Sequence, residues 1–128
     1  MLKKDDDIPY IDKPWGYERI FGHTDAYAGK YLFIEEGHRL SRQYHTLKEE
    51  TIYVLAGPLI IEVGPDDEGE LSSIELVEGD AYHVAAGTIH RFCAPETNHV
   101  ELIEVSTPEL QDVVRIEDDY SRLPLVDA

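Results

Sequence analysis

Apolar and polar residues alternate in short runs along most of this chain, and turn residues interrupt the runs at close intervals. A period of two is typical of strands with one buried face, and no segment shows the 3.6-residue period of a long amphipathic helix. We therefore predict an all-β domain. The expected strands cover residues 17–21, 30–35, 40–45, 51–56, 59–63, 71–77, 81–85, 89–94 and 100–106.

The two ends of the chain lack this alternation. We expect residues 1–12 to form an N-terminal arm or an edge strand lent to a partner, and residues 107–128 to form a C-terminal tail. Within this C-terminal tail, we expect residues 107–122 to form either a short helix or an extended flap. The 128 residues suit one domain. Short antiparallel strands in this number fit an immunoglobulin-like sandwich or a jelly-roll barrel.

Composition narrows the class of protein. Hydrophobic residues make up 42% of the chain, yet no apolar run approaches the roughly 18 residues of a membrane span, and the first residues lack the apolar core of a signal peptide. The single Cys93 rules out an internal disulfide and fits a reducing compartment. The sequence thus predicts a soluble, cytoplasmic protein. Its formal net charge of -16 argues against nucleic acid and membranes as partners, because both are anionic.

Two short clusters contain residue types that bind metal ions. In the first, Gln43 and His45 stand two residues apart, so their side chains point to the same face of a strand, and Glu50 follows after a turn. In the second, His90 begins a strand after a glycine turn. In a small barrel the shared face is the interior, and the four side chains converge only if these strands are neighbours. That convergence favours the jelly roll. Glu49 is an alternative to Glu50 as the carboxylate ligand.

The predicted site holds one divalent metal ion. Two imidazoles, one carboxylate and one amide oxygen leave one or two positions for water or substrate. The amide oxygen favours manganese or iron(II) over copper, with zinc, nickel and cobalt as alternatives. Such a site suits an iron oxygenase or, with a redox-silent metal, the isomerisation of hydroxy-carbonyl compounds.

Basic residues concentrate beside these ligands. Arg39, Arg42, Lys48 and Arg91 all lie within a few residues of them, although the whole chain has only 11 basic residues. One interpretation is an anionic small-molecule substrate, and the other is that these cations only pair with surrounding carboxylates. His83, in the strand before the second glycine turn, is a candidate proton carrier if it lines the pocket.

The spacing of the two clusters resembles the two-part motif of the cupins. The first part runs from Gly37 to Gly57 and the second from Gly79 to His90. Three positions depart from the pattern, which has histidine, proline and asparagine where this chain has Gln43, Ala85 and Ala94. The resemblance implies a double-stranded β-helix, or jelly-roll barrel, with residues 1–128 as a single cupin domain.

A second similarity is spread over about 110 residues. The segments that carry it are Lys13-Pro14-Trp15-Gly16, Leu40-Ser41-Arg42-Gln43-Tyr44-His45, His90-Arg91, Ile103-Glu104-Val105 and the stretch from Asp112 to Arg122. They resemble the cupin domain of type II mannose-6-phosphate isomerases. Arg42, Lys48 and His83 stand where that family has an apolar residue, arginine and tyrosine, so the substrate need not be mannose 6-phosphate.

This similarity implies roles for individual residues. It assigns the metal to Gln43, His45, Glu50 and His90. It makes Lys48, Arg91, Arg115 and Arg122 candidates for holding a sugar phosphate or stabilising an enediolate, and Arg39 and Arg42 remain substrate-binding candidates. Lys48 or His83 would act as the base only if deprotonated near neutral pH, and Glu49 only if it faces inward. Alternatively, the charged tail residues pin the C-terminus by ion pairs.

Together these observations predict a metal-dependent cupin that acts on a sugar or sugar phosphate, most simply as an aldose-ketose isomerase. That reaction needs a base to move a proton between C1 and C2 and a cation to hold the developing oxyanion. An iron(II)-dependent oxygenase and a non-catalytic small-molecule-binding cupin are the alternatives. By analogy with small cupins that pair through sheet edges, we also expect a homodimer.

Overall fold

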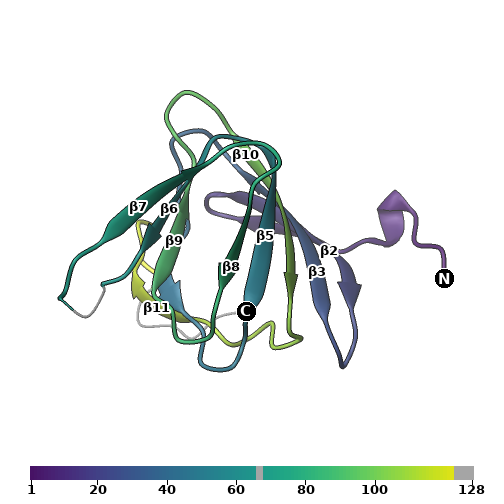
Figure 1. Cartoon of the computed structure of the whole chain (residues 1–128). Helices are drawn as coiled ribbons and strands as arrows, with labels where there is room; N and C mark the ends of the chain where they lie inside the picture. Colours follow the sequence, from purple (N-terminus) through teal and green to yellow (C-terminus); the bar gives the residue numbers. More distant parts are fainter. Residues whose placement is uncertain (66–67, 123–128) are drawn as a thin grey trace.

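The computed structural model describes residues 1–65 and 68–122. In these residues the chain forms two antiparallel sheets that enclose a barrel interior (Figure 1). The six-stranded sheet has the order β1 (Tyr10–Lys13), β2 (Gly16–His23), β3 (Ala28–Ile34), β10 (Val100–Ser106), β5 (Glu50–Ala56) and β8 (Ala81–Val84). The five-stranded sheet has the order β11 (Val114–Glu117), β4 (Arg42–Tyr44), β9 (His90–Cys93), β6 (Leu59–Val63) and β7 (Ser72–Leu76).

Strands far apart in the sequence pair in a nested order. β3 pairs with β10, β4 with β9, β5 with β8 and β6 with β7, all of them antiparallel. Successive pairs belong alternately to the six-stranded and the five-stranded sheet. This nesting is the topology of a jelly roll, in which one long hairpin is wound into a barrel. The predicted all-β jelly roll is therefore confirmed, and the immunoglobulin-like alternative is wrong.

The inward faces of the strands are apolar toward one end of the barrel and charged toward the other. In β10, Leu102 belongs to the apolar core, whereas Glu104 on the same face is a buried carboxylate. In β3, Leu32 and Lys30 repeat this division, and the strand register places Leu32 opposite Leu102 and Lys30 opposite Glu104. The barrel interior thus has an apolar half and a charged half.

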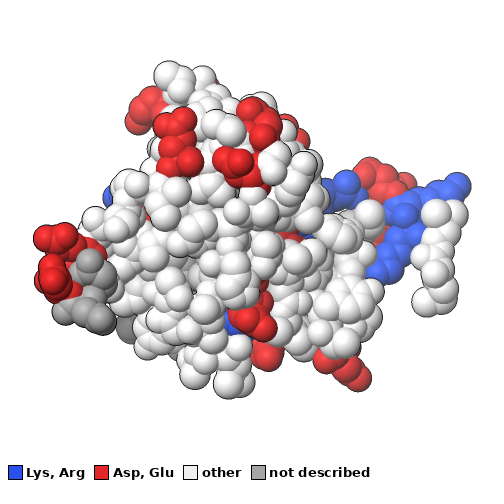
Figure 2. Space-filling model, viewed as in Figure 1, with Lys and Arg blue, Asp and Glu red and all other residues white. Residues whose placement is uncertain are grey.

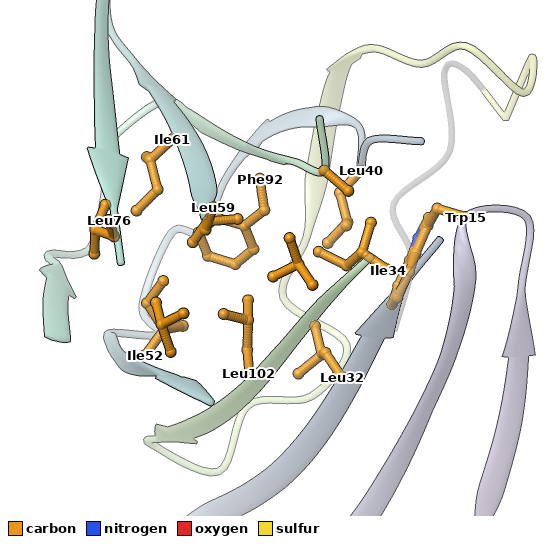
Figure 3. Close-up of a cluster of buried hydrophobic side chains, with 13 residues drawn as sticks. Trp15, Leu32, Ile34, Leu40, Ile52, Leu59, Ile61, Leu76, Phe92 and Leu102 are labelled. Atoms are coloured by element: carbon orange, nitrogen blue, oxygen red, sulfur yellow. The ribbon is translucent and has the colours of Figure 1, made fainter. Parts of the chain in front are cut away.

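The apolar half is packed by side chains from both sheets. In Figure 3, Ile52, Leu59, Phe92 and Leu102 point toward one another, and all four are buried members of one hydrophobic cluster. Burying an apolar side chain of this size contributes roughly 1.5–3 kcal/mol. This half therefore holds the two sheets together and leaves the charged half to be stabilised by other means.

Both ends of the chain join the sheets, in part against expectation. Residues 10–12 are not a free arm, because β1 pairs with β2 of the same chain after a short 3-10 turn (Asp5–Asp7). In the tail, β11 pairs with β4, so the helical alternative is wrong and the extended one is nearer the structure. These strands have four residues each, too few to show a period.

The predicted tail residues 123–128 lie outside the described residues. No helix in the described parts is long and apolar enough to cross a bilayer.

Candidate metal centre and substrate cavity

Three of the predicted metal ligands meet inside the barrel. His45 follows β4, Glu50 opens β5 and His90 opens β9. The Nε2 atoms of His45 and His90 lie 3.3 Å and 3.1 Å from Glu50 Oε1, and all three side chains are 1% exposed. One ligand atom from each lies within 4.8 Å of the other two. The sequence clusters thus form one compact group in the charged half of the barrel.

Strand geometry explains why Glu50, and not Glu49, joins this group. Glu50 has the same orientation as Ile52 and Val54 in β5, so it points inward with them. Glu49 is exposed, and its carboxylate lies 3.5 Å from the exposed His83 ring. The predicted fourth ligand, Gln43, is opposite His90 in the pairing of β4 with β9 and lines the same cavity. Its Oε1 accepts a hydrogen bond from Ser41 Oγ at 2.8 Å.

Backbone carbonyls fix the protonation of both imidazoles. His45 Nδ1 lies 2.7 Å from the carbonyl oxygen of Asp112, and His90 Nδ1 lies 2.8 Å from that of Thr88. A carbonyl oxygen only accepts, so each Nδ1 carries a proton, and Nε2 is the ring nitrogen that could bind a metal ion. Both Nε2 atoms face a Glu50 oxygen, which is an acceptor.

This arrangement of acceptors fits a bound cation. Among the described residues, the buried His90 Nε2 has no hydrogen-bond donor or acceptor in acceptable geometry. Three electron-rich atoms directed at one point repel one another unless a proton or a metal ion lies between them, and two imidazoles with one carboxylate are ordinary metal donors. The residues present therefore fit a divalent metal.

Asp112 supports the centre in a way that the sequence did not reveal. Its carboxylate accepts hydrogen bonds from the backbone N–H groups of Thr46, Leu47 and Lys48 at 2.9, 2.6 and 2.8 Å. Its own carbonyl accepts from His45. Partial burial opposes the effect, but these donors lower the pKa of Asp112. One tail residue thus orders both a ligand and the loop that follows it, as outer-shell groups do in metal sites.

Lys48 is inside the cavity but is a cation, not the predicted base. Its Nζ lies 3.3 Å from Glu50 and 3.2 Å from Glu104, and the side chain is 4% exposed. Burial alone would lower the pKa of Lys48, but the charges of Glu104 and Glu50 raise it overall. A lysine held between two carboxylates orients them and balances their charge.

His83 and Arg91 do not line the cavity, so their placement does not support the predicted action of either residue on substrate. In β8 the buried residue is Val84, and the adjacent His83 points to solvent, where its ring is 3.1 Å from Thr51 Oγ1. In β9, His90 points inward and Arg91 to the opposite face. There Arg91 donates to the carbonyls of Leu40 and Glu117 at 2.9 and 3.2 Å. It fastens the tail to the barrel.

Arg39 and Arg42 share this structural role, which corrects their assignment to substrate. Arg39 forms two hydrogen bonds to Asp119, at 2.7 and 3.0 Å. Arg42 precedes the inward-facing Gln43 and so points outward, where it pairs with Glu117 at 3.1 Å. The alternative that the basic residues pair with nearby carboxylates therefore describes these two arginines and Arg91.

The cavity does contain the two arginines from the C-terminal segment. Arg115, on β11 opposite Gln43, is 8% exposed and lines the cavity. Arg122 also lines it and pairs with Asp118 at 2.8 and 3.0 Å. The cavity itself has a volume of about 50 Å³. That is smaller than the roughly 300–1,000 Å³ of sites for drug-sized ligands.

Further charged residues of the cavity were not predicted. They come from β1, β2, β3 and β10 and are Lys13, Glu18, Lys30 and Glu104. The sequence does contain a signal for three of them: a charged residue stands in register with buried residues of the same strand, as Lys30 does with Leu32.

The cavity differs in charge from the outer surface. Most charged atoms on the face shown in Figure 2 are acidic, and basic atoms gather mainly beside the N-terminal segment. Inside, the cations are Lys13, Lys30, Lys48, Arg115 and Arg122, against the carboxylates Glu18, Glu50 and Glu104. In a chain with a net charge of -16, this concentration of cations favours an anionic ligand.

The jelly-roll fold and the ligand group at its interior define this protein as a cupin with a candidate metal centre. Comparison with known families narrows the class. The profile described as mannose-6-phosphate isomerase C-terminal matches residues 5–119, and the chain belongs to this family. The resemblance inferred from the sequence is thereby confirmed.

Curated relatives are much longer than this chain. Alginate biosynthesis protein AlgA of Pseudomonas aeruginosa is 28% identical over 115 residues, which are 88% of this chain and 23% of that protein. Mannose-1-phosphate guanylyltransferase ManC of Salmonella typhimurium is 31% identical over 116 residues, again 88% and 23%. The chain therefore spans under a quarter of the length of these relatives.

Solved structures with the same fold include three cupins. Capsular polysaccharide assembling protein CapF from Staphylococcus aureus has a TM-score of 0.75 at 15% identity, over 86% of this chain and 34% of that chain. Oxalate decarboxylase from Bacillus subtilis has a TM-score of 0.75 at 18% identity, over 87% and 30%. KdgF from Halomonas sp. has a TM-score of 0.66 at 24% identity, over 82% and 92%. At these identities the likeness establishes the fold alone.

Proposed function

We propose that this protein is a metal-dependent isomerase of an anionic sugar, most simply a sugar phosphate. The observation that carries the proposal is the convergence of His45, His90 and Glu50, whose acceptor atoms face one another beside a cation-rich cavity. Membership of the mannose-6-phosphate isomerase C-terminal family supports the sugar-phosphate class. The particular sugar stays open because Lys48, one of the departures from the family, lines the cavity. Arg42 and His83, two further departures, do not line it.

His45, Glu50 and His90 would hold the ion, and Gln43 is the proposed fourth ligand. Gln43 Oε1 accepts one bond from Ser41 and keeps a second lone pair. Manganese or iron(II) is proposed ahead of zinc because an amide oxygen is a hard donor, and oxalate decarboxylase of Bacillus subtilis, which shares the fold, has Mn(II) centres. When bound, the ion polarises a substrate oxygen and stabilises negative charge that develops on it.

The other cavity residues would bind and orient the substrate. Arg115 and Arg122 are proposed to hold its anionic group, because guanidinium groups match phosphate oxygens in geometry. Lys48 forms ion pairs with both Glu50 and Glu104, and the contact with Glu50 holds that carboxylate in place. Proton transfer between C1 and C2 requires a group that reaches the bound sugar, which excludes His83 and Glu49 on the outer surface.

Substitution of a ligand tests the proposal. His45→Ala should lose both bound metal and activity, because it removes one of two imidazoles. Metal content is measured by mass spectrometry, and activity as exchange of the C2 proton of aldose phosphates, followed by NMR in heavy water. The matched control is His83→Ala, an exposed histidine that should change neither quantity. Exchange that persists in metal-free His45→Ala would contradict the proposal.

An iron(II)-dependent oxygenase is the second candidate. Two histidines and one carboxylate with open positions are also the ligand set of non-haem iron oxygenases. This function predicts consumption of oxygen with an organic substrate and loss of activity when zinc replaces iron. Bound metal with saturable stabilisation by a sugar phosphate, but no turnover and no oxygen consumption, would instead identify a non-catalytic binding cupin.

The homodimer stays a prediction. β1 and β8 are the edges of the six-stranded sheet, and β11 and β7 are those of the five-stranded sheet. Light scattering across a concentration series measures the mass directly, with 14.6 kDa expected for a monomer and twice that for a dimer.

A further inference from the structure

A second buried ion pair lies in the cavity apart from the ligand group. Lys30 Nζ is 3.4 Å from both carboxylate oxygens of Glu18, and each side chain is 7% exposed. The two residues come from the adjacent strands β2 and β3 and line the cavity together with Trp15 and Leu32. Both occupy inner-face positions that the same strands elsewhere give to apolar residues.

The stability of the fold does not account for this pair. Removing two charges from water carries a desolvation penalty that their attraction often fails to offset, and replacing such a pair by apolar residues of similar volume is often neutral or stabilising. The contacts of 3.4 Å are also longer than the 2.7–2.9 Å that is usual for strong charge-assisted bonds. Glu18 and Lys30 are therefore better explained by what they contact in the cavity.

A line of alternating charges joins the pair to the metal centre. Lys30 is opposite Glu104 in the pairing of β3 with β10. Burial and the charge of Glu50 raise the pKa of Glu104 overall, and the charge of Lys30 opposes this rise. Glu104 contacts Lys48, which contacts the ligand Glu50. The pair is thus in the same cavity as the ligands but separated from them by two charged residues.

We propose that Glu18 and Lys30 form a hydroxyl-binding subsite for the polyol part of a sugar phosphate. A hydroxyl group both donates and accepts, and here an acceptor carboxylate and a donor ammonium stand side by side. Trp15 adds an apolar wall for the C–H surface of the sugar. The inference rests on the proposed function, in which the metal holds the carbonyl end and the arginines hold the phosphate.

The test separates binding from stability. In the metal-loaded protein, Glu18→Leu with Lys30→Met should leave the melting temperature unchanged or higher and the affinity for inorganic phosphate unchanged. The affinity for mannose 6-phosphate should fall at least about tenfold, the effect of losing one charge-assisted hydrogen bond. Both affinities are measured by calorimetry. The matched control is the surface pair of Arg19 and Asp5, replaced by Arg19→Met with Asp5→Leu, which should alter neither affinity.

Two outcomes would overturn the subsite. One is a clear fall in melting temperature with the ratio of sugar-phosphate to phosphate affinity unchanged, which would make the pair structural. The other is wild-type protein that binds mannose 6-phosphate no better than inorganic phosphate. If instead the sugar is preferred, the double variant loses that preference and the wild type still shows no C2 exchange, the subsite stands and the isomerase proposal fails.

Discussion

The two halves of the barrel interior are built from the same strands and the same inward-facing positions, yet their chemistry is opposite. In β10 the step from Leu102 to Glu104 passes from the apolar core to a buried carboxylate, and in β5 the step from Ile52 to Glu50 does the same. The apolar half needs nothing but close packing. In the charged half, Lys48 lies between Glu50 and Glu104, and the Nε2 atoms of two histidines face Glu50. One barrel therefore contains an apolar half that stabilises the fold and a charged half that contains the candidate metal centre. Substitutions in the two halves should differ in whether added metal changes the loss of stability.

The largest effect on stability is expected from the apolar half. Leu102→Ala should lower the free energy of unfolding by about 4 kcal/mol, because it removes buried methyl groups and leaves a cavity. Urea unfolding measures the loss. The same loss should be seen with and without Mn²⁺ in solution, since Leu102 is in contact with the core and not with the ligand group. A loss that metal reverses would show that the two halves are not separable.

A charged-half substitution should be nearly as large but sensitive to metal. Lys48→Met leaves Glu50 and Glu104 facing each other without their shared cation, so the metal-free protein should lose about 3 kcal/mol. Added Mn²⁺ should restore part of it, because the ion then balances Glu50. Urea unfolding with chelator and with Mn²⁺ gives both values. The exposed Lys4→Met is the control, and equal losses in the two conditions would contradict the prediction.

Asp112→Asn should have a smaller effect that depends on pH. The pKa of Asp112 is lowered in the folded protein, so its carboxylate stabilises the fold above the unfolded pKa of about 4, and this contribution is lost as the pH falls through the folded value. At pH 7 the variant should lose about 1–2 kcal/mol. The difference from the wild type should shrink as the pH falls below the unfolded pKa of about 4. Unfolding curves at pH 7, 5 and 3 measure it, and a constant difference would contradict the assignment.

The smallest effect is expected outside the barrel. Arg39→Ala removes a pair with Asp119 whose side chains are 40% and 42% exposed, so the loss should be below about 1 kcal/mol. Because Arg39 does not line the cavity, sugar-phosphate affinity should not change. Arg115→Ala is the variant to compare, because Arg115 lines the cavity and its loss should weaken that affinity. A large loss of sugar-phosphate affinity in Arg39→Ala would contradict this expectation and support a substrate-binding role for Arg39.

The barrel and the three residues of the candidate metal centre could be predicted because both depend on local order in the sequence. Spacing of two residues fixes a shared face for Gln43 and His45, and turn residues mark the strands. Proximity along the chain does not place a side chain in the cavity, as Arg42 and Arg91 show. Arg42 and Arg91 are next to Gln43 and His90, and for that reason point to the opposite face of the sheet.

Other features could not be obtained from periodicity. Arg115 and Arg122 enter the cavity because a segment without a clear pattern crosses the barrel and adds β11 to the sheet. Their assignment came from family resemblance. Glu18, Lys30 and Glu104 are an intermediate case, since charges on the inner face of a strand can be recognised once the apolar face of that strand is known.

The hydrogen bonds of Asp112 also bear on how the protein is made. All three ligands of the candidate centre, His45, Glu50 and His90, leave the ribosome before Asp112, which holds the 46–48 loop and the His45 ring. Chains are synthesised from the N-terminus at about 5–20 residues per second. A nascent chain therefore carries all three residues of the candidate centre before Asp112 can order them, so their final arrangement should form only after residue 112 has been synthesised.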